Sequence, residues 1–497
     1  MTVGDGRVPR TITKSILQFS ASSLFTALVG VPVSLASARL LGPYLLGVWS
    51  QVLLVQSYLA NFHLGVWAGM NRELPLRRGM QDLDGARAVK DVTFSFVLPA
   101  AVLASLIGWV FSWLKGYEGD TRLAFHFLPV LVLSQYAETF FVMLLKSENR
   151  FDVISMAQVV RALSSIGVVG LLFFAHFEGY LWGYVATALL LVTYFARKST
   201  YHPRLHWDTR TFTSLVRVGF VIMMIDLAGT LLETSDRLVI LSALGVTAFG
   251  QYNLGVRLGR LVSVACASIG PVLYPRMTEE FGRTRDSSSL ARFVIFPVTL
   301  ASRIFPVALA GLVLVLPGVV HLLLSDYRPA IAAAQVYTYG LFFSIILDTS
   351  GYLLIVLGRQ ISYLTMLLVS AGGNLLLNWL LASLGLGLVG IALGATVVRA
   401  CFAVVVIASS LKACGESDRR VARIIGRDLL WPAVLVAGVT FSIDSMVPVG
   451  GTWFEVGGMF SIRIAALLLG TFWLPLSALR EFRAHRALGL IGLRQQS

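Results

Sequence analysis

Long apolar runs, each long enough to cross the hydrocarbon core of a bilayer, repeat along the whole chain and are separated by short polar connectors. An α-helix rises about 1.5 Å per residue, so about 20 apolar residues span that core. The pattern predicts an all-α, polytopic membrane protein with about 14 transmembrane helices. The predicted helices are residues 14–38, 44–67, 92–113, 123–145, 153–176, 179–196, 214–241, 248–273, 293–319, 330–357, 361–382, 386–410, 429–447 and 457–478.

Composition agrees with this class, because 56% of the residues are hydrophobic and only 13% are charged. The net charge of +14 follows the predicted topology rather than forming a nucleic-acid patch. When the connectors are assigned alternately to two sides, only Arg39, Lys115, Arg122 and Arg328 fall on the less basic side. The positive-inside rule then places both termini in the cytoplasm. The first apolar run is too long for a signal peptide and is expected to stay as the first helix.

Several sequence patterns of enzymes and metalloproteins are missing. The three cysteines show no disulfide framework or metal-ligand spacing, and the chain has no Walker A, HExxH or paired CxxC pattern. We expect no cofactor, no metal and no catalytic residues. A membrane glycosyltransferase or polymerase remains the alternative from another class, but the outer connectors are too short for the sizeable catalytic loop expected of one.

An internal repeat divides the chain. Residues 41–49 (LGPYLLGVW) share their spacing of Leu-Gly, Gly and an aromatic residue with residues 244–252 (LGVTAFGQY), and the GxxxG pattern of residues 179–183 returns at 390–394. Both pairs are separated by nearly the same interval, which makes chance a weaker explanation than for one GxxxG alone. An even number of helices per repeat gives two parallel halves, a known transporter plan with the substrate site between them.

The repeat predicts three parts. Two pseudo-symmetric six-helix lobes are followed by an additional helix pair. The parts are an N-lobe at residues 1–200, a C-lobe at 201–415, and the C-terminal helices with a cytoplasmic tail at 416–497.

Arginines occur inside several predicted spans, where a charge at mid-bilayer costs about 2.5–3.5 kcal/mol unless it faces water or an anion. They are Arg161, Arg237, Arg257, Arg260, Arg303, Arg399 and Arg463. Arg303 and Arg463 are interpreted as snorkelling towards the span ends, outside any site. A guanidinium fork donates two hydrogen bonds to one phosphate, so the other arginines predict a cationic cavity for a phosphate or diphosphate.

Arg257 and Arg260 lead this set. In the helix predicted at 248–273, Gly255 and Gly259 share one face and the two arginines lie roughly opposite. If the glycine face packs on a neighbouring helix, the arginines point into a cavity or into lipid, and lipid is the costly alternative.

Acidic residues within or beside spans could pair with the arginines or bind a coupling proton or sodium ion. These are Asp226, Glu233, Asp236, Glu138, Asp348 and Asp444. Glu233 and Arg237 have the i,i+4 spacing of a helix salt bridge. A self-neutralised pair that joins two helices is the structural alternative to a cavity-lining role. Ser370, Asn374 and Asn378 form a polar stripe that could contact sugar hydroxyls or hydrogen bond between helices.

Four short motifs give the chain a resemblance to a known family. They are residues 38–43 (ARLLGP), 71–74 (NREL), 235–237 (SDR) and 274–276 (YPR). With them the sequence resembles the polysaccharide transporter family of O-antigen and exopolysaccharide flippases. The family belongs to the superfamily of multidrug/oligosaccharidyl-lipid/polysaccharide flippases, which also contains multidrug/toxin extruders and lipid II flippases.

The resemblance implies a flippase in the bacterial inner membrane. It would move a polyprenyl-diphosphate-linked oligosaccharide from the cytoplasmic to the outer leaflet by alternating access, for export polysaccharide synthesis. A lipid II flippase is the first alternative and a multidrug extruder the second. The implied partners are the lipid-linked glycan and membrane lipids, with a complex with a polymerase or glycosyltransferase left open.

The resemblance also adds two site residues. In lipid II flippases, basic residues of the first two helices help to hold the lipid diphosphate, which implies this role for Arg72 and, less directly, for Arg39 in the connector. An ordinary interfacial anchor is the alternative for both. Arg161 and Arg399 join the predicted substrate site as second members, with helix ends or backbone carbonyls as their alternative partners.

Overall fold

A computed structural model of the chain describes residues 10–266, 269–446 and 453–478, and these residues form helices and short connectors without any strand. The chain divides into two compact units, Met1–Thr230 and Leu231–Ser497. The predicted all-α membrane fold is confirmed, whereas the three-part division at residues 200 and 415 stays a prediction.

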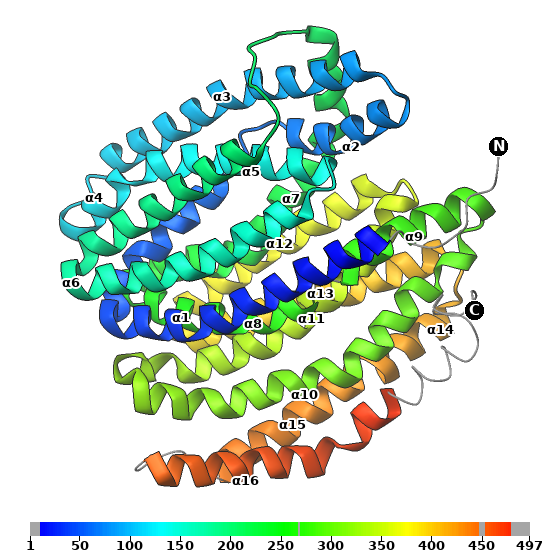
Figure 1. Cartoon of the computed structure of the whole chain (residues 1–497). Helices are drawn as coiled ribbons and strands as arrows, with labels where there is room; N and C mark the ends of the chain where they lie inside the picture. The colour runs from blue at the N-terminus through cyan, green and yellow to red at the C-terminus, as the bar shows by residue number, and fades with distance from the viewer. Residues whose placement is uncertain (1–9, 267–268, 447–452, 479–497) are drawn as a thin grey trace. The chain divides into compact units, whose positions relative to one another are not determined.

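The first unit is built on two very long helices, α1 and α6, which pack against each other, while α5 packs against both α3 and α6 (Figure 1). Its helices are α1 (Arg10–Leu59), α2 (Val66–Gly79), α3 (Leu83–Leu114), α4 (Gly119–His126), α5 (Leu128–Ser147), α6 (Phe151–Lys198) and the first part of α7 (Thr209–Ala243).

Both long helices are bent, and the bends divide each into two lengths suited to a membrane. The apolar part of α1 has 39 residues and α6 has 48, while about 20 suffice for one crossing. The backbone leaves helical geometry at Gly42, with φ 68°, and at Ala175 and His176, where His176 has φ 51°. These bends lie next to the connectors that the sequence predicts after residues 38 and 176.

The number of spans is consistent with the sequence. In the described part of the chain, ten helices are long and apolar enough to cross a membrane, and a shorter apolar helix covers Gly458–Thr471. Two of these ten, the bent helices α1 and α6, each correspond to two predicted spans. The helix predicted at residues 248–273 is not among the ten, and it corresponds to α8.

The first part of α7 contacts α2 at an unusually close approach of two backbones. A Cβ added at Gly65 would lie 2.3 Å from the carbonyl carbon of Gly219, and one added at Gly69 would lie 2.4 Å from the carbonyl oxygen of Leu215. Gly65 also has φ 81°, a conformation that costs glycine little. Glycine therefore fixes this contact for two independent reasons.

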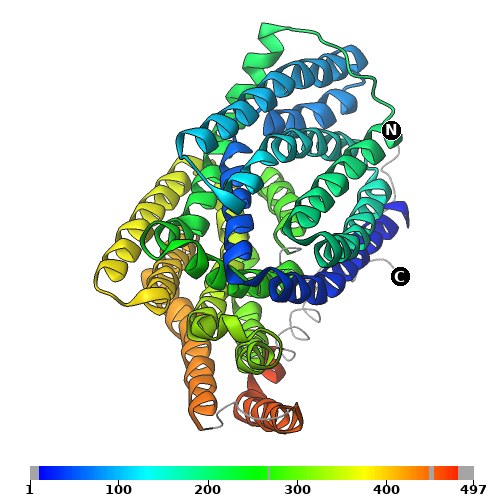
Figure 2. The same cartoon turned by 90° about the vertical axis from the view of Figure 1, so that its left-hand side faces the viewer.

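The second unit surrounds α11, which packs against α8, α10 and α13, while α12 packs on α13. Its remaining helices are α8 (Gly245–Cys266), α9 (Ile269–Thr284), η1 (Ser288–Leu290), α10 (Arg292–Leu323), η2 (Ser325–Ala330), α11 (Ile331–Val356), α12 (Gln360–Ser383), α13 (Gly387–Ala413), α14 (Asp418–Arg423), the π-helical segment η3 (Ile424–Leu430), α15 (Trp431–Met446) and α16 (Trp453–Thr471). Figures 1 and 2 both show α15 and α16, in orange and red, beside α10.

The π-helical segment joins α14 to α15 without a break in the helical chain. Ser302 of α10 donates a hydrogen bond to the Asp428 carbonyl within it. Beyond the segment, Val436 and Ile443 are buried with Ala310 and Leu314 of α10. The hydrogen bond and the apolar contacts together hold α15 on α10.

Candidate functional site

A group of buried charged side chains lies in the second unit, around the carboxylate of Asp236 on α7. Asp236 is fully buried and accepts hydrogen bonds from the Tyr252 hydroxyl at 2.7 Å and the Arg399 Nη2 at 3.3 Å. The Arg237 Nε lies 4.0 Å from the other carboxylate oxygen. The Arg399 guanidinium lies 4.7 Å from the ring centre of Tyr337. We call these five residues the Asp236 cluster.

The cluster joins side chains from four helices. Asp236 and Arg237 come from α7, Tyr252 from α8, Tyr337 from α11 and Arg399 from α13. All five residues are at most 7% exposed. A buried charge of this kind is tolerated only when it is paired and hydrogen-bonded, so the fold of this unit depends on the cluster.

The charges of the cluster do not balance. Two guanidinium groups share the single carboxylate of Asp236. Within the described structure, the Arg237 Nε and the Arg399 Nη1 are buried without a hydrogen-bond acceptor. Glu233 is exposed, and it contributes its backbone carbonyl, which accepts from Arg237 Nη2 at 3.1 Å. The buried part of the cluster therefore contains two guanidinium groups and one carboxylate.

Arg237 pairs with Asp236, the residue before it in the sequence, and not with Glu233 as the i,i+4 spacing predicts. The described carboxylate partner of Arg237 is Asp236, whose Oδ1 also accepts the Arg237 backbone N–H at 2.8 Å. The helix places the Arg237 guanidinium over the Glu233 carbonyl instead, because the side chain turns back along α7.

The asparagine stripe on α12 supports α7 beside the cluster. Asn374 donates to the Leu232 carbonyl at 3.1 Å and to the Ser235 hydroxyl at 2.6 Å, and Asn378 donates to Asn374 at 2.8 Å. Both asparagines are fully buried. The stripe therefore makes hydrogen bonds between helices, the second of the two roles that the sequence left open.

On α8, the glycine face does pack on a neighbouring helix. A Cβ at Gly255 would lie 2.6 Å from the Ala334 Cβ, and one at Gly259 would lie 2.4 Å from the Leu341 Cδ1, both on α11. Arg257 is half-buried and makes no hydrogen bond or ion pair with a residue that the structure describes. The side chains of Arg260 and Asp348, both named from the sequence, lie outside the described part of the structure.

The candidates of the first unit are more accessible. Arg161 on α6 forms an ion pair with Glu138 on α5, and the two side chains are 48% and 23% exposed. Arg39 on α1, Arg72 on α2 and Asp226 on α7 are exposed. The structure thus joins Arg161 to Glu138 and leaves the guanidinium groups of Arg39 and Arg72 at the surface of their own unit.

One predicted behaviour is wrong. Arg463 was expected to snorkel, but it is 1% exposed, pairs with Asp444 at 2.8 Å and donates to the Leu314 carbonyl at 3.1 Å. The sequence offered no local sign of the pair, because the two residues belong to different helices, α15 and α16. Arg463 helps to attach both to α10.

Tyr252 and Tyr337 are residues of the Asp236 cluster that the sequence did not single out. Tyr252 ends the repeated LGxxxxGxY pattern, and its hydroxyl orients Asp236. That pattern was a usable signal for Tyr252. In the described residues, no group of three His, Cys, Asp or Glu side chains is placed to hold a metal ion.

Long apolar helices and charged side chains inside the helical units define a multi-pass membrane protein with a transporter fold. Solved structures agree: the lipid II flippase MurJ in an inward closed conformation matches with a TM-score of 0.65 at 13% identity, over 94% of this chain and 99% of that one. A MOP superfamily transporter from Pyrococcus furiosus matches with a TM-score of 0.58 at 16% identity, over 83% and 96%.

The family follows from the sequence match. Residues 12–281, more than half of the chain, match the family described as polysaccharide biosynthesis protein, and the chain belongs to that family. A putative O-antigen transporter from Shigella flexneri is 22% identical over 324 residues, which are 60% of this chain and 76% of that protein. The resemblance drawn from the four short motifs is thereby confirmed.

Proposed function

We propose that this protein is a flippase that moves a polyprenyl-diphosphate-linked oligosaccharide from the cytoplasmic to the outer leaflet, and that it acts as a transporter rather than an enzyme. Membership of the polysaccharide biosynthesis family supports a lipid-linked glycan as substrate. The observation that carries the proposal is Arg257, a half-buried arginine on a helix of this membrane fold that has no described counter-charge.

Arg257 has the properties that a diphosphate site needs. Its helix packs on α11 through Gly255 and Gly259, so the backbone that carries Arg257 is fixed before a ligand arrives. An unpaired arginine in a membrane segment is costly unless it faces water or an anion. A diphosphate offers several oxygens to its planar fork.

The other arginines divide into two roles in this proposal. Arg237 and Arg399 are already bound to Asp236 and contribute a fixed positive potential that favours an anionic headgroup. Arg260, Arg72, Arg161 and Arg39 are the further arginines that we propose to test for a role in diphosphate binding. Because Asp236 is held by two arginines and a tyrosine, it acts as a structural counter-charge, not as a coupling group.

In the proposed cycle the headgroup enters a cationic cavity from the cytoplasm, the protein changes its accessibility, and the glycan leaves on the outer side while the lipid tail stays in the bilayer. Moving about two negative charges outward across an inside-negative potential of roughly 100 mV contributes about 4–5 kcal/mol. The membrane potential alone is then sufficient to drive export. Transport that continues unchanged after the potential is dissipated at constant pH gradient would disprove this coupling.

The carboxylates give a second route to coupling. Asp226 and Glu233 are exposed on α7, and Glu138 is held by Arg161. With Asp348, they are the groups we propose to test for proton or sodium coupling. A proton-driven cycle would lose transport when the pH gradient is collapsed at constant potential.

The proposed setting is the bacterial inner membrane with both termini in the cytoplasm, because the basic residues gather on the connectors of one side. Membrane lipids surround the helices, and a complex with a polymerase or glycosyltransferase would place the chain next to the enzymes that use its product. Cysteine accessibility at the two ends of α10 would test the orientation.

The decisive experiment measures flipping of a fluorescent polyprenyl-diphosphate oligosaccharide in proteoliposomes. Wild type is compared with Arg257→Ala/Arg260→Ala and with the control Arg204→Ala/Arg210→Ala, which removes two exposed arginines elsewhere in the chain. We expect transport to fall at least about tenfold in the first variant and to be retained in the control. Full activity of Arg257→Ala/Arg260→Ala would contradict the role of α8.

A lipid II flippase is the second candidate, because 94% of this chain matches the MurJ structure with a TM-score of 0.65. The substrates share a polyprenyl diphosphate and differ in the sugar. Complementation in cells depleted of their lipid II flippase distinguishes the two: growth would favour lipid II, whereas failure to grow with normal membrane expression would favour an export oligosaccharide.

A further inference from the structure

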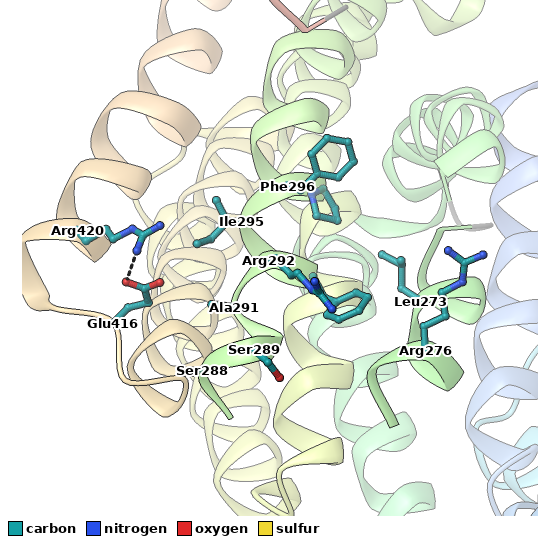
Figure 3. Close-up of a pocket in the computed structure, with 12 residues that line it drawn as sticks. Leu273, Arg276, Ser288, Ser289, Ala291, Arg292, Ile295, Phe296, Glu416 and Arg420 are labelled. Atoms are coloured by element: carbon teal, nitrogen blue, oxygen red, sulfur yellow. Dashed lines mark ion pairs between the residues drawn. The ribbon is translucent and has the colours of Figure 1, made fainter. Parts of the chain in front are cut away.

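A second basic site lies away from the Asp236 cluster and is not used by the proposed transport cycle. It is a pocket of about 500 Å³ at the start of α10, between α9, η1 and the α13–α14 connection (Figure 3). Three arginines line it: Arg276 from α9, Arg292 from α10 and Arg420 from α14. Pockets of this size hold small organic ligands.

The positive charge of the pocket exceeds its local neutralisation. Arg292 pairs with Glu280 at 3.1 Å, and Arg420 pairs with Glu416 at 3.1 Å. Arg276 is exposed and forms no ion pair or hydrogen bond with a described residue. Three arginines against two glutamates leave one cation available, and both existing pairs are partly exposed, so an anion can compete for them.

The floor of the pocket is apolar, unlike a site for a free inorganic ion. Leu273, Phe293, Ile295, Phe296 and Pro297 line it, and Ser288 and Ser289 add hydroxyl groups near the arginines. Figure 3 shows α10 between the Arg420–Glu416 pair on one side and Leu273 and Arg276 on the other. The combination suits an amphiphile with an anionic phosphate and an apolar portion.

The surroundings favour one source for this amphiphile. Four more exposed arginines occupy the neighbouring ends of α9 and α14, namely Arg283, Arg285, Arg419 and Arg423. The positive-inside rule assigns such an end to the cytoplasmic leaflet, whose anionic lipids attract basic residues. We propose that this pocket binds the phosphate headgroup of an anionic phospholipid from that leaflet, with Arg276 and Arg292 as the main contacts and the apolar floor against its glycerol and acyl portion.

The test measures lipid binding, not transport, so its outcome is independent of the proposed function. The purified full chain is titrated with phosphatidylglycerol, and bound lipids are counted by native mass spectrometry. We expect Arg276→Gln/Arg292→Gln to weaken binding at least about tenfold. The matched control, Arg419→Gln/Arg423→Gln, removes the same charge from exposed positions outside the pocket and is expected to change binding less than about twofold.

A third variant separates shape from charge. Ile295→Trp fills the apolar floor and keeps every arginine, and it should reduce phosphatidylglycerol binding as well. A variant enters the comparison only if its unfolding midpoint is close to that of wild type, which shows that it is folded. If a variant does not fold, the comparison of phosphatidylglycerol with phosphatidylcholine on wild type still decides the charge requirement.

Three results would overturn the proposal. Equal weakening by both arginine pairs would mean diffuse attraction to the basic end. Equal binding of phosphatidylcholine would remove the requirement for an anion. Displacement of the lipid by millimolar inorganic phosphate alone would indicate a site for free anions. Selective loss in the pocket variants, with no competition by phosphate, supports a phospholipid site.

Discussion

The Arg161–Glu138 pair of the first unit and the Asp236 cluster of the second treat charge in opposite ways. In the first unit, Arg161 and Glu138 form a one-to-one pair whose side chains are 48% and 23% exposed. In the second, Asp236 is fully buried and serves two arginines at once. The first arrangement is a single accessible pair, and in the second two buried guanidinium groups share one buried carboxylate.

The difference distinguishes arginines that the fold requires from arginines that can bind a ligand. A buried carboxylate that satisfies two guanidinium groups cannot be removed without leaving both unpaired. An exposed pair can exchange one partner for a substrate anion at small cost. Buried arginines such as Arg399 and accessible ones such as Arg161 both occur inside predicted spans. Their positions along the sequence therefore do not distinguish them.

The largest expected effect is on Asp236. Asp236→Ala should lower the free energy of unfolding by about 3–5 kcal/mol, because Arg237 and Arg399 would remain buried without a counter-charge. The shift is measured by thermal or chemical unfolding in detergent. Glu138→Ala is the control from the other unit, and equal loss in the two variants would remove the contrast.

A smaller loss is expected for Tyr252→Phe. The substitution keeps the ring and removes the 2.7 Å hydrogen bond to Asp236, which should cost about 1.5–3 kcal/mol because the acceptor is charged. Tyr337→Phe serves as control, since the Tyr337 ring contacts Arg399 through its face. A change in the Tyr252→Phe variant no larger than in Tyr337→Phe would indicate that the hydroxyl does not support the carboxylate.

Glu138→Gln tests the surroundings of the accessible pair. If Arg161 faces water, the loss should be below about 1 kcal/mol. A loss of several kcal/mol would instead place Arg161 against lipid, where an unpaired cation is costly. Unfolding midpoints of wild type and variant, compared at low and high salt, distinguish these cases because salt screens only a water-exposed pair.

The smallest effect concerns Asp82, outside the spans of the first unit. Arg77 donates to it at 2.7 Å and the Gly85 N–H at 2.8 Å, and both hold the pKa of the Asp82 carboxyl below its usual value. A lowered pKa in the folded state adds stability above the unfolded-state pKa of about 3.9, and that contribution declines below this pH and is lost as the pH falls through the lower folded-state pKa. The difference in unfolding midpoint between wild type and Asp82→Asn should therefore shrink from pH 6 to pH 3.5.

Much of the architecture is readable from hydropathy, because each span needs its own apolar run. Gly42 also shows in the sequence, since Gly42-Pro43 marks the bend of α1. The bend of α6 at His176 has no Gly-Pro pair, but hydropathy predicts a connector directly after it. The Gly65–Gly219 contact was not predicted either, because it depends on how α2 and α7 pack, which periodicity does not encode.

The charged site was predictable in its residue types but not in its pairings. The sequence places Asp236, Arg237 and Arg399 in spans. Only the packing of the helices shows that the two arginines share the carboxylate of Asp236. The pair of Arg463 with Asp444 escaped for the same reason. Partner choice among buried charges depends on distances between helices, and a single sequence contains no direct measure of these.

The π-helical segment at Ile424–Leu430 sets the rotation of everything that follows it. Wide i+5 turns accommodate an extra residue, which advances the chain by about 100° around the helix axis relative to a regular α-helix. Deleting one residue there would restore regular winding and turn Val436 and Ile443 away from α10. The number of residues in the segment therefore sets the direction in which α15 presents its apolar side chains. With one residue fewer, these side chains would no longer face α10.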